Sequence, residues 1–375
     1  MGKYGKKNHV SLNPADVSII FLGQPKIGKT TIMKEIAEKL VGEDYMFFEM
    51  FREVGERYIE GIISEPIEDW EKFEDVVSDI EENKPTDYKD LKMIIIDTWD
   101  NAVLLAEKET IRRYNRDNPD SKKKTINEVY GGFQRGQKKA ADLLNEMLDR
   151  LKNVGIKVNI IMHVKNKSIV DIASEKEYQQ LTADAAQSYF NAIKMNYDVI
   201  AVAYIDREIV TQSTGRKDIK GKVITINSVK DEVRKIKFRD TGYAIDAGGR
   251  LKYITEEVPF EADAFIDAVK DALQKEIETN GISVENRKKE DKKREKDAEK
   301  IALANSEKAK KARIDEELKV KNETYIDIVK AKYPNASDKV KTEVKATMKE
   351  YGFKSFNDEN IPTEALEKIV NLFEE

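Results

Sequence analysis

The chain has 375 residues, 40% hydrophobic and 37% charged, and its 66 basic and 71 acidic side chains leave a formal net charge of −5. This balance excludes a uniformly basic nucleic-acid binder, so any such binding must be local. The absence of cysteine excludes disulfides, thiol catalysis and cysteine-based zinc sites, and two histidines are too few for a histidine-built metal centre. No apolar run reaches membrane-spanning length and the first residues lack a signal-peptide core, which favours a cytoplasmic protein with no membrane partner.

Residues 18–37 carry the sharpest motif of the chain. The apolar run Ile19–Leu22 predicts a buried strand, and residues 32–40 have the spacing of an amphipathic helix. Between them, Gly23–Thr30 matches G-x-x-x-x-G-K-[ST], a phosphate loop whose backbone N–H groups surround phosphate oxygens. Lys29 is expected to reach the β- and γ-phosphates, and the Thr30 hydroxyl to ligate Mg²⁺. The predicted nucleotide-binding residues of this segment are Gly23, Gln24, Pro25, Lys26, Ile27, Gly28, Lys29, Thr30 and Thr31.

A second strand motif supplies a carboxylate for the metal. Met93–Ile96 is an apolar run typical of a central parallel strand with both faces covered, and Asp97 follows it. Because ligands bind at the carboxyl ends of strands in open α/β sheets, Asp97 is predicted to hold Mg²⁺ through water. The alternative is that Asp97 caps a helix beginning near Asn101. A further predicted strand, 158–163, ends in His163, which either faces the γ-phosphate or is a hydrogen-bonded structural residue.

The remaining elements complete an α/β pattern. Further strands are predicted at 45–51, 198–205, 222–226 and 233–238, the last two as a hairpin. Helices are predicted at 65–80, over most of 102–153 and at 260–277. Residues 165–191 are expected to be polar and partly mobile.

The segment Arg112–Lys139 departs from the acidic average of the chain. It holds nine basic and three acidic residues, with Tyr114, Tyr130 and Phe133 interleaved and glycines at 131, 132 and 136. This composition suits single-stranded nucleic acid, whose phosphates pair with cations and whose bases stack on rings. It suits a solvated loop and a helix start equally well, so the composition leaves both interpretations open.

The composition changes again beyond Gly281. Residues 285–313 hold twelve basic and seven acidic side chains and almost no large apolar ones, which predicts a solvated single helix or a disordered arm. Helical periodicity returns over 322–375 and predicts a small three-helix module. The predicted domains are a basic N-terminal arm (1–17), an α/β core (18–258), a helix with a charged linker (259–320) and a helical C-terminal module (321–375).

Several stretches occur together in an order known from one family: GQPKIGKTT, EVG at 53–55, IEDW, MIIIDTWDN, VYGGFQRG, MHVKNK and the strand at Asp198. In these the chain resembles the phage-encoded RecA-like ATPases, including the Sak-type single-strand annealing recombination proteins, over about residues 16–255. The resemblance implies a RecA-like P-loop core with a mainly parallel sheet that binds and hydrolyses ATP with Mg²⁺. It also implies action on single-stranded DNA in phage recombination, annealing or replication, in the cytoplasm of a bacterial host cell. Assembly into a ring or filament and contact with a single-strand binding protein are further expectations from it.

The resemblance also assigns roles to residues. Glu53 matches the family's water-activating glutamate and is predicted to be catalytic together with Lys29, although Val54 departs from the common E-P-G and Glu49 lies close by. The predicted DNA-binding residues are Arg112, Arg113, Lys122, Lys123, Lys124, Arg135, Lys138, Lys165 and Lys167. Two alternatives share the phosphate loop: a DNA-binding module that ATP switches without hydrolysis, and a P-loop kinase, which the basic glycine-bearing segment fits less well.

Overall fold

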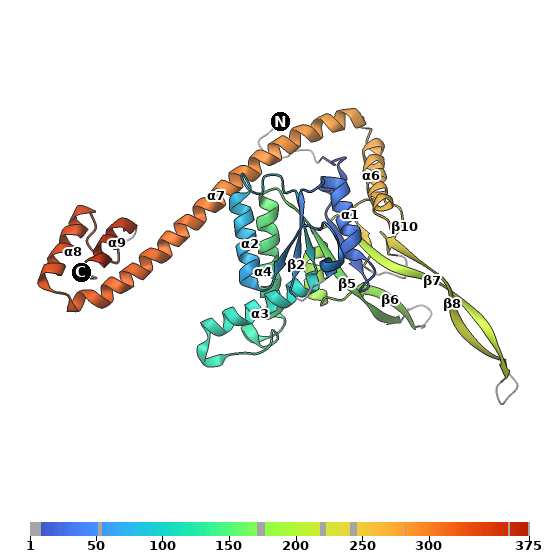
Figure 1. The fold of residues 1–375 in the computed structure, drawn as a ribbon, viewed down its shortest axis with the longest axis horizontal. Coiled ribbons are helices and arrows are strands. Elements are labelled where there is room, and N and C mark those ends of the chain that lie inside the picture. The colour runs from blue at the N-terminus through green and yellow to red at the C-terminus, as the bar shows by residue number, and fades with distance from the viewer. Residues whose placement is uncertain are drawn as a thin grey trace. The chain divides into compact units, whose positions relative to one another are not determined.

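The structure, a computed structural model, describes residues 9–51, 55–170, 177–217, 223–240, 246–281, 283–358 and 361–373. The chain divides into two units, Met1–Leu303 and Ala304–Glu375. The first is an α/β unit and the second is helical (Figure 1). No helix in the described ranges is both long and apolar enough to cross a membrane.

One mixed sheet organises the α/β unit. Among the described residues, ten strands form it in the order β10-β8-β7-β1-β5-β4-β2-β3, with β6 added to β5 and β9 to β7. The strands from β3 to β7 along this order are parallel to their neighbours, which confirms the mainly parallel sheet of the predicted P-loop fold. The strands are β1 (Ile19–Gly23), β2 (Tyr45–Met50), β3 (Ser64–Ile67), β4 (Met93–Asp97), β5 (Lys157–Val170), β6 (Glu177–Ala183), β7 (Val199–Lys217), β8 (Val223–Lys237), β9 (Gly248–Gly249) and β10 (Glu257–Pro259).

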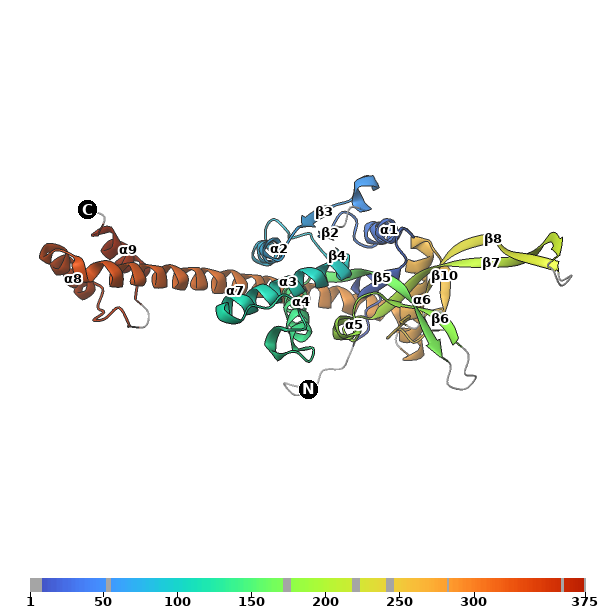
Figure 2. The same cartoon turned by 90° about the horizontal axis from the view of Figure 1, so that it is seen from below.

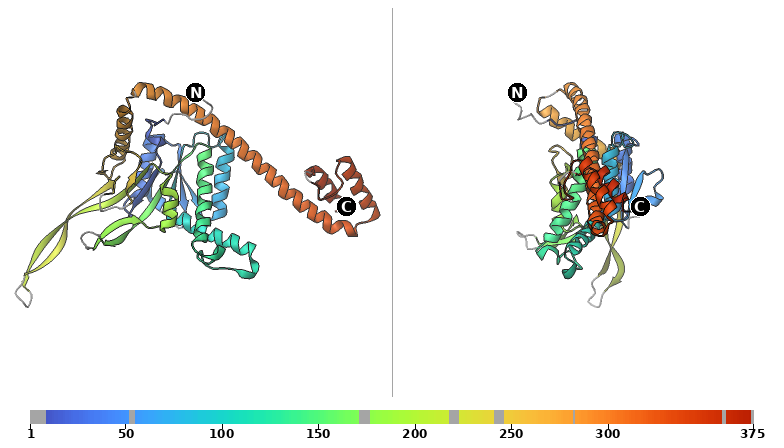
Figure 3. Two further views of the ribbon diagram at one scale, coloured as in Figure 1. Left: turned by 180° about the vertical axis from the view of Figure 1, so that it is seen from behind. Right: turned by 90° about the vertical axis from the view of Figure 1, so that its left-hand side faces the viewer.

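Helices cover both faces of this sheet. Alternate residues of a strand point to opposite faces, so Phe21 and Ile95 join one hydrophobic cluster while Leu22 and Ile96 join the other. The Phe21 face is covered by α1 (Lys29–Val41) and α6 (Ala262–Thr279), and the Leu22 face by α2 (Trp70–Asn83), α3 (Trp99–Asp117), α4 (Arg135–Asn153) and α5 (Gln187–Lys194). Figures 1 and 3 show α1 beside α6, and α2 beside α4. Because β1 and β4 are buried along their whole length, they contain almost only apolar residues.

Three parts of the α/β unit extend beyond the carboxyl end of β1. Gly23 is in register with His163 of β5 and with Ala203 of β7, and both neighbouring strands run on beyond these positions. The extension of β5 pairs with β6, and that of β7 pairs with β8 in the long ribbon seen in Figures 1 and 2. The third is the basic lobe (residues 112–139), which runs from the end of α3 through η3 (Pro119–Ser121) and η4 (Val129–Gly131) to the start of α4. All three lie at the same end of the α/β unit (Figures 1 and 3).

The helix predicted at 65–80 is wrong in its first turn. Residues 64–67 form β3, which pairs with β2, and α2 begins only at Trp70. Pro66 lies in this edge strand. Proline has no backbone N–H, but on the open side of an edge strand no neighbouring strand accepts a hydrogen bond, so none is lost. Asp69 then caps α2, because its carboxylate accepts a hydrogen bond of 2.8 Å from the Lys72 N–H.

Two segments of the second half of the sheet differ from the sequence analysis. Residues 165–191, for which the sequence predicts no strand or helix, form the end of β5, then β6, then α5 where the structure describes them. The strands predicted at 222–226 and 233–238 are one strand, β8, and its hairpin partner is β7. In the β7–β8 ribbon exposed, mostly polar side chains hide the strands, whereas β6 packs Leu181 and Ala183 into the core between polar neighbours.

The predicted N-terminal arm is packed rather than loose over the residues that the structure describes. His9 Nε2 lies 2.7 Å from Asp291 Oδ1, and the Leu12 N–H donates a hydrogen bond of 3.1 Å to Asp291 Oδ2. Asp291 belongs to α7 (Val284–Lys332), a single helix of 49 residues, which agrees with the single-helix alternative for 285–313. Residues 1–8 lie outside the described ranges.

The helical unit confirms the predicted helical C-terminal region. The end of α7, η5 (Tyr333–Asn335), α8 (Asp338–Glu350) and α9 (Thr363–Asn371) surround one hydrophobic cluster that contains Val329, Val344 and Ile369. Ser337 caps α8 by accepting a hydrogen bond of 3.3 Å from the Val340 N–H.

The cap of α2 gives a test of where this helix begins. Replacing Asp69 by Ala removes the cap, and we expect the free energy of unfolding of the α/β unit to fall by about 0.5–2 kcal/mol. Asp69→Asn keeps an oxygen acceptor and should remain close to the parent protein. Urea denaturation followed by circular dichroism measures both variants, and equal losses in the two would contradict a capping role.

Candidate functional site

The phosphate loop follows β1 and leads directly into α1. Gly28 is the N-cap of α1 and has φ +106°, a left-handed conformation that favours glycine. No side chain caps α1, so its first backbone N–H groups are available to an anion, as at other helix N-termini. Of the predicted phosphate-loop residues, Ile27 is buried, whereas Pro25, Lys26 and Thr31 are exposed.

Gly23 is required by close packing at the start of the loop. A Cβ atom at this position would lie 3.1 Å from Ile27, 3.2 Å from the Ala203 Cβ and 3.2 Å from the Lys29 Cδ. The loop therefore starts in direct contact with β7 and folds back toward the lysine. Lys29 is only 6% exposed, and its Nζ donates a hydrogen bond of 3.1 Å to the Gln24 carbonyl across the loop.

Thr30 and Asp97 meet as the metal prediction requires. Asp97, at the end of β4, is 4% exposed, and its Oδ2 accepts a hydrogen bond of 2.5 Å from the Thr30 hydroxyl. The helix-cap alternative for Asp97 is wrong, because Thr98 is the N-cap of α3. A hydroxyl and a carboxylate in contact form the hard oxygen set that Mg²⁺ prefers when a nucleotide supplies further ligands. These residues fit a Mg²⁺–nucleotide complex.

Glu49 joins this pair from the next strand. It is in register with Asp97 on β2, and strand alternation places both side chains on the face covered by α1, together with Phe47 and Ile95. Its Oε1 is buried and has no hydrogen-bond partner within the described part of the chain. A buried carboxylate oxygen without a partner indicates a place for a water or ligand. Glu53, the predicted catalytic residue, lies outside the described residues.

His163 sits beside the loop but is oriented toward α3. It is in register with Gly23, and its backbone N–H donates a hydrogen bond of 2.8 Å to Asp100 Oδ2. The same oxygen lies 3.1 Å from His163 Nδ1, so Asp100, in the first turn of α3, orients the imidazole. This contact supports the structural interpretation of His163, and its predicted contact with the γ-phosphate stays a prediction.

An arginine that the sequence did not single out also reaches the loop. Arg234, on β8, donates a hydrogen bond of 3.3 Å from Nη1 to the Ile27 carbonyl, and the Phe260 ring lies 3.4 Å from where a Gly28 Cβ would be. The segment 233–238 was predicted to be a strand, but no local pattern indicates that the strand crosses the phosphate loop. Only the sheet order brings Arg234 there.

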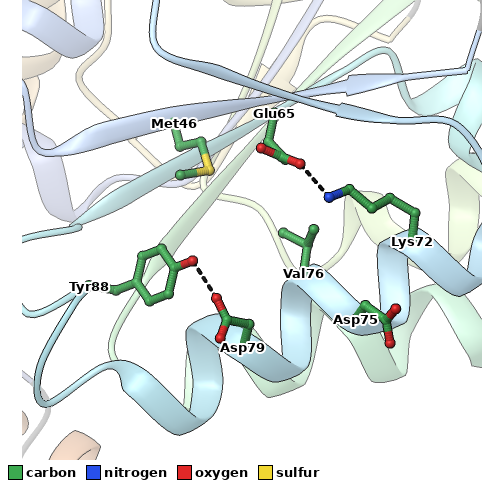
Figure 4. A pocket seen from close by; sticks show the side chains of 7 residues that line it. All are labelled: Met46, Glu65, Lys72, Asp75, Val76, Asp79 and Tyr88. Atoms are coloured by element: carbon green, nitrogen blue, oxygen red, sulfur yellow. Dashed lines mark hydrogen bonds and ion pairs between the residues drawn. The ribbon is translucent and has the colours of Figure 1, made fainter.

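Two cavities of the α/β unit lie away from this loop. One of about 350 Å³ lies between β2, β3 and α2 (Figure 4) and is lined by three carboxylates and one lysine. Lys72 already pairs with Glu65 at 2.6 Å, and the Tyr88 hydroxyl donates to Asp79, a bond that, with burial, raises the pKa of Tyr88 to about 12. Such an acidic lining disfavours phosphate. A larger cavity of about 850 Å³ borders Lys92 and Lys157, at the opposite end of the strands.

The structure separates the predicted DNA-binding residues into two groups. Arg112 and Arg113 both donate to Glu109, whose side chain is 4% exposed, and Arg113 also pairs with Glu74. Although burial alone would raise the pKa of Glu109, these bonds hold that pKa below its ordinary value. The two arginines are therefore committed to a structural ion-pair network. Lys122, Lys124, Arg135, Lys138 and Lys167 are exposed, Lys123 is half-buried, and Lys165 donates to the Asp184 carbonyl.

The sheet is mainly parallel, and a phosphate loop follows its central strand β1. The threonine of this motif is hydrogen-bonded to an aspartate at the end of β4. Together these features define the class of P-loop nucleotide-binding proteins. A family profile described as an AAA domain matches residues 15–250, and the chain belongs to this family of P-loop ATPases. The matched range contains the phosphate loop, Glu49, Asp97, the basic lobe and Arg234. No curated protein sequence matches the chain.

Lys29 provides the first test of this site. Lys29→Ala removes a cation that a nucleotide phosphate would contact, and we expect ATP affinity to fall about 10- to 100-fold. Isothermal titration calorimetry with Mg²⁺ and ATP measures the loss, while circular dichroism checks that the fold is retained. Lys39→Ala is the matched control, because Lys39 is an exposed lysine in the last turn of α1, at the far end of the helix from the loop. ATP affinity equal to that of the parent protein in Lys29→Ala would contradict this site.

Proposed function

We propose that the chain is a Mg²⁺-dependent ATPase that couples ATP hydrolysis to work on single-stranded DNA in phage recombination, annealing or replication. The observation that carries the hydrolytic part is the convergence of Thr30, in the first turn of α1, with Asp97 and Glu49, near the carboxyl ends of β4 and β2. Membership of the AAA family supports ATPase activity in general.

Each of these side chains has a distinct role in the proposal. Lys29 and the first N–H groups of α1 bind the phosphates, and Thr30 and Asp97 hold Mg²⁺, which when bound neutralises the charge that develops on them. Glu49 orients a water for attack on the γ-phosphate and can accept its proton. A carboxylate oxygen can accept a hydrogen bond from this water only if another donor does not already occupy it. The Oε1 of Glu49 meets this condition, because it has no hydrogen-bond partner among the described residues.

Glu49 is preferred here to Glu53, which the resemblance had favoured. Its register with Asp97 places it beside the metal-holding carboxylate, and its side chain lies on the face of the sheet where α1 begins. The two glutamates are separable by experiment, because only one of them can position the same water.

Glu49→Gln keeps the size of the side chain and removes its basicity, so we expect the rate of ATP hydrolysis to fall about 10²- to 10⁴-fold with ATP affinity retained. Phosphate release in a single-turnover experiment measures the rate, and calorimetry measures the affinity. Glu53→Gln is run in parallel. If only Glu53→Gln loses hydrolysis, the assignment to Glu49 is wrong. If the parent protein hydrolyses no ATP with or without single-stranded DNA, the non-hydrolysing switch replaces the ATPase.

The nucleic-acid part of the proposal rests on where the basic lobe lies. Asp97 is followed almost at once by α3, which runs into the lobe, so one helix connects the metal-holding strand to the cluster of cations. The lobe, the β5–β6 hairpin with Lys165 and Lys167, and the β7–β8 ribbon share one end of the unit (Figure 1). The resemblance to RecA-like phage proteins supports single-stranded DNA as the partner. Assembly into a ring or filament and contact with a single-strand binding protein stay predictions.

A P-loop kinase is the less favoured function. It would transfer phosphate to an acceptor that needs a pocket beside the loop, and neither cavity described above borders the loop. Phosphate transfer to a small molecule, without stimulation of hydrolysis by DNA, would favour it.

The lysines of the lobe test the DNA contact. In the triple variant Lys122→Ala, Lys123→Ala and Lys124→Ala, we expect weaker binding of a fluorescein-labelled single-stranded oligonucleotide and a slope of log K against log salt reduced by up to about 2. Fluorescence anisotropy over a salt series measures both. The matched control replaces Lys339, Lys345 and Lys349, three exposed lysines of the helical unit. An unchanged slope in the lobe variant would place the phosphate contacts elsewhere.

A further inference from the structure

The segment of the basic lobe that leads into α4 has an unusual backbone. Five consecutive residues, from Tyr130 to Gln134, have positive φ angles: 54°, 84°, 74°, 50° and 61°. Glycine adopts such angles without strain, but Tyr130, Phe133 and Gln134 do so at a cost of roughly 1–2 kcal/mol each. The strain must be opposed by packing elsewhere. Gly136 shows this packing, because a Cβ there would lie only 2.2 Å from the Ile126 carbonyl oxygen.

The aromatic residues of the lobe differ in how far their rings are exposed to solvent. Tyr114 and Tyr130 pack edge to face on one another, with ring centroids 5.1 Å apart, and both are half-buried. Phe133, three residues later, is 95% exposed. The sequence presents three interleaved rings, but only the Phe133 ring is presented to solvent with its faces open.

Phe133 does not serve the stability of the fold. An exposed phenylalanine gains almost nothing from burial, which is what stabilises this side chain elsewhere. Its left-handed backbone conformation is one that a glycine would adopt with less strain. A large apolar ring held outward at this cost indicates a binding role, since strain of this kind is found at functional sites.

Four exposed cations lie near Phe133 in the chain. Arg135 and Lys138 are in the first turn of α4, shortly after Phe133, and Lys122 and Lys124 precede it in the lobe. The Arg135 Nη1 lies 3.5 Å from where a Gly131 Cβ would be, which places this guanidinium beside the strained backbone. Two of the three acidic residues of the lobe are used internally: Asp117 pairs with Arg116 at 3.0 Å, and Glu128 accepts hydrogen bonds from Thr125. A ring among exposed cations suits a ligand that combines a flat apolar surface with negative charge, which is the chemistry of an unpaired nucleotide.

We propose that Phe133 is a base-stacking residue that selects unpaired bases, with the neighbouring cations on the phosphates to either side. This inference rests on the proposed action on DNA and adds that the lobe recognises single strands through their bases. The competing occupant is an apolar pocket of a second copy of this chain, which the surrounding cations disfavour.

The test compares Phe133→Ala, Phe133→Leu and Phe133→Tyr. We expect Phe133→Ala and Phe133→Leu to lose about 5- to 100-fold in affinity for a fluorescein-labelled single-stranded oligonucleotide, since stacking accounts for that much per base. Phe133→Tyr keeps the ring and should bind as the parent does. The slope of affinity against salt should not change in any of them, because no charge is removed. Met195→Ala, at an exposed apolar residue outside the lobe, is the control.

A spectroscopic signature separates stacking from a general loss of binding. Stacking on Phe133 should change the fluorescence of 2-aminopurine placed in the oligonucleotide, and Phe133→Leu should abolish the change even at saturating protein. Equal loss of single-stranded and duplex binding, an unaltered affinity in Phe133→Ala, or a loss of self-association in place of DNA affinity would each overturn the inference.

Failure of this inference can be told apart from failure of the proposed function. If the parent protein binds single-stranded DNA and the lysine variant weakens that binding while Phe133→Ala does not, the lobe binds DNA without stacking on this ring. If the parent protein binds no DNA, the proposed function fails and the inference fails with it. Phe133→Gly, which relieves the backbone strain, should be at least as stable as the parent, so a loss of affinity in that variant does not come from unfolding.

Discussion

The hydrogen bond between Thr30 and Asp97 joins residues 67 positions apart, and most of the α/β unit is needed to form it. β1 and β4 are not neighbours, because β5 lies between them in the sheet. The threonine reaches across this strand only because Gly28 turns the chain sharply into α1 and because α1 packs on the face to which Asp97 points. The bond thus depends on the strand order, on a glycine conformation and on the side of the sheet that each residue faces.

The same elements connect the phosphate loop with the surface of the unit. The lobe lies at the end of α3, which begins shortly after Asp97, and the β5 and β7 extensions begin beside Gly23. β8 returns from its ribbon to place Arg234 against the Ile27 carbonyl. α3, β5, β7 and β8 are continuous hydrogen-bonded elements, which are among the structures that can carry coupling between two sites.

Whether a basic side chain of the lobe is available to a ligand depends on its ion-pair partners more than on the composition of the segment. The chain is acidic overall, and nine basic residues between 112 and 139 mark the lobe as an exception. Arg112 and Arg113 nevertheless neutralise the buried Glu109, so their charges stabilise α3 rather than attract a ligand. The cations Lys122, Lys124, Arg135 and Lys138 are exposed instead. Basic residues at a helix N-terminus are unfavourable for the helix itself, so Arg135 and Lys138 do not stabilise α4 through its dipole.

The sequence by itself determined what depends on a few consecutive residues. The phosphate loop, the buried strand before Asp97, the amphipathic helices and the helical C-terminal region follow from spacing and side-chain type, and all were predicted. The tertiary structure decided what depends on contacts between distant segments: Glu49 beside Asp97, Arg234 at the phosphate loop, the pairing of Tyr114 with Tyr130, and the exposure of Phe133. β6 and the pairing of β7 with β8 were missed for the same reason, because strand pairing sets them. Strand register, helix packing and backbone conformation set these relations, and none of them leaves a local pattern in the chain.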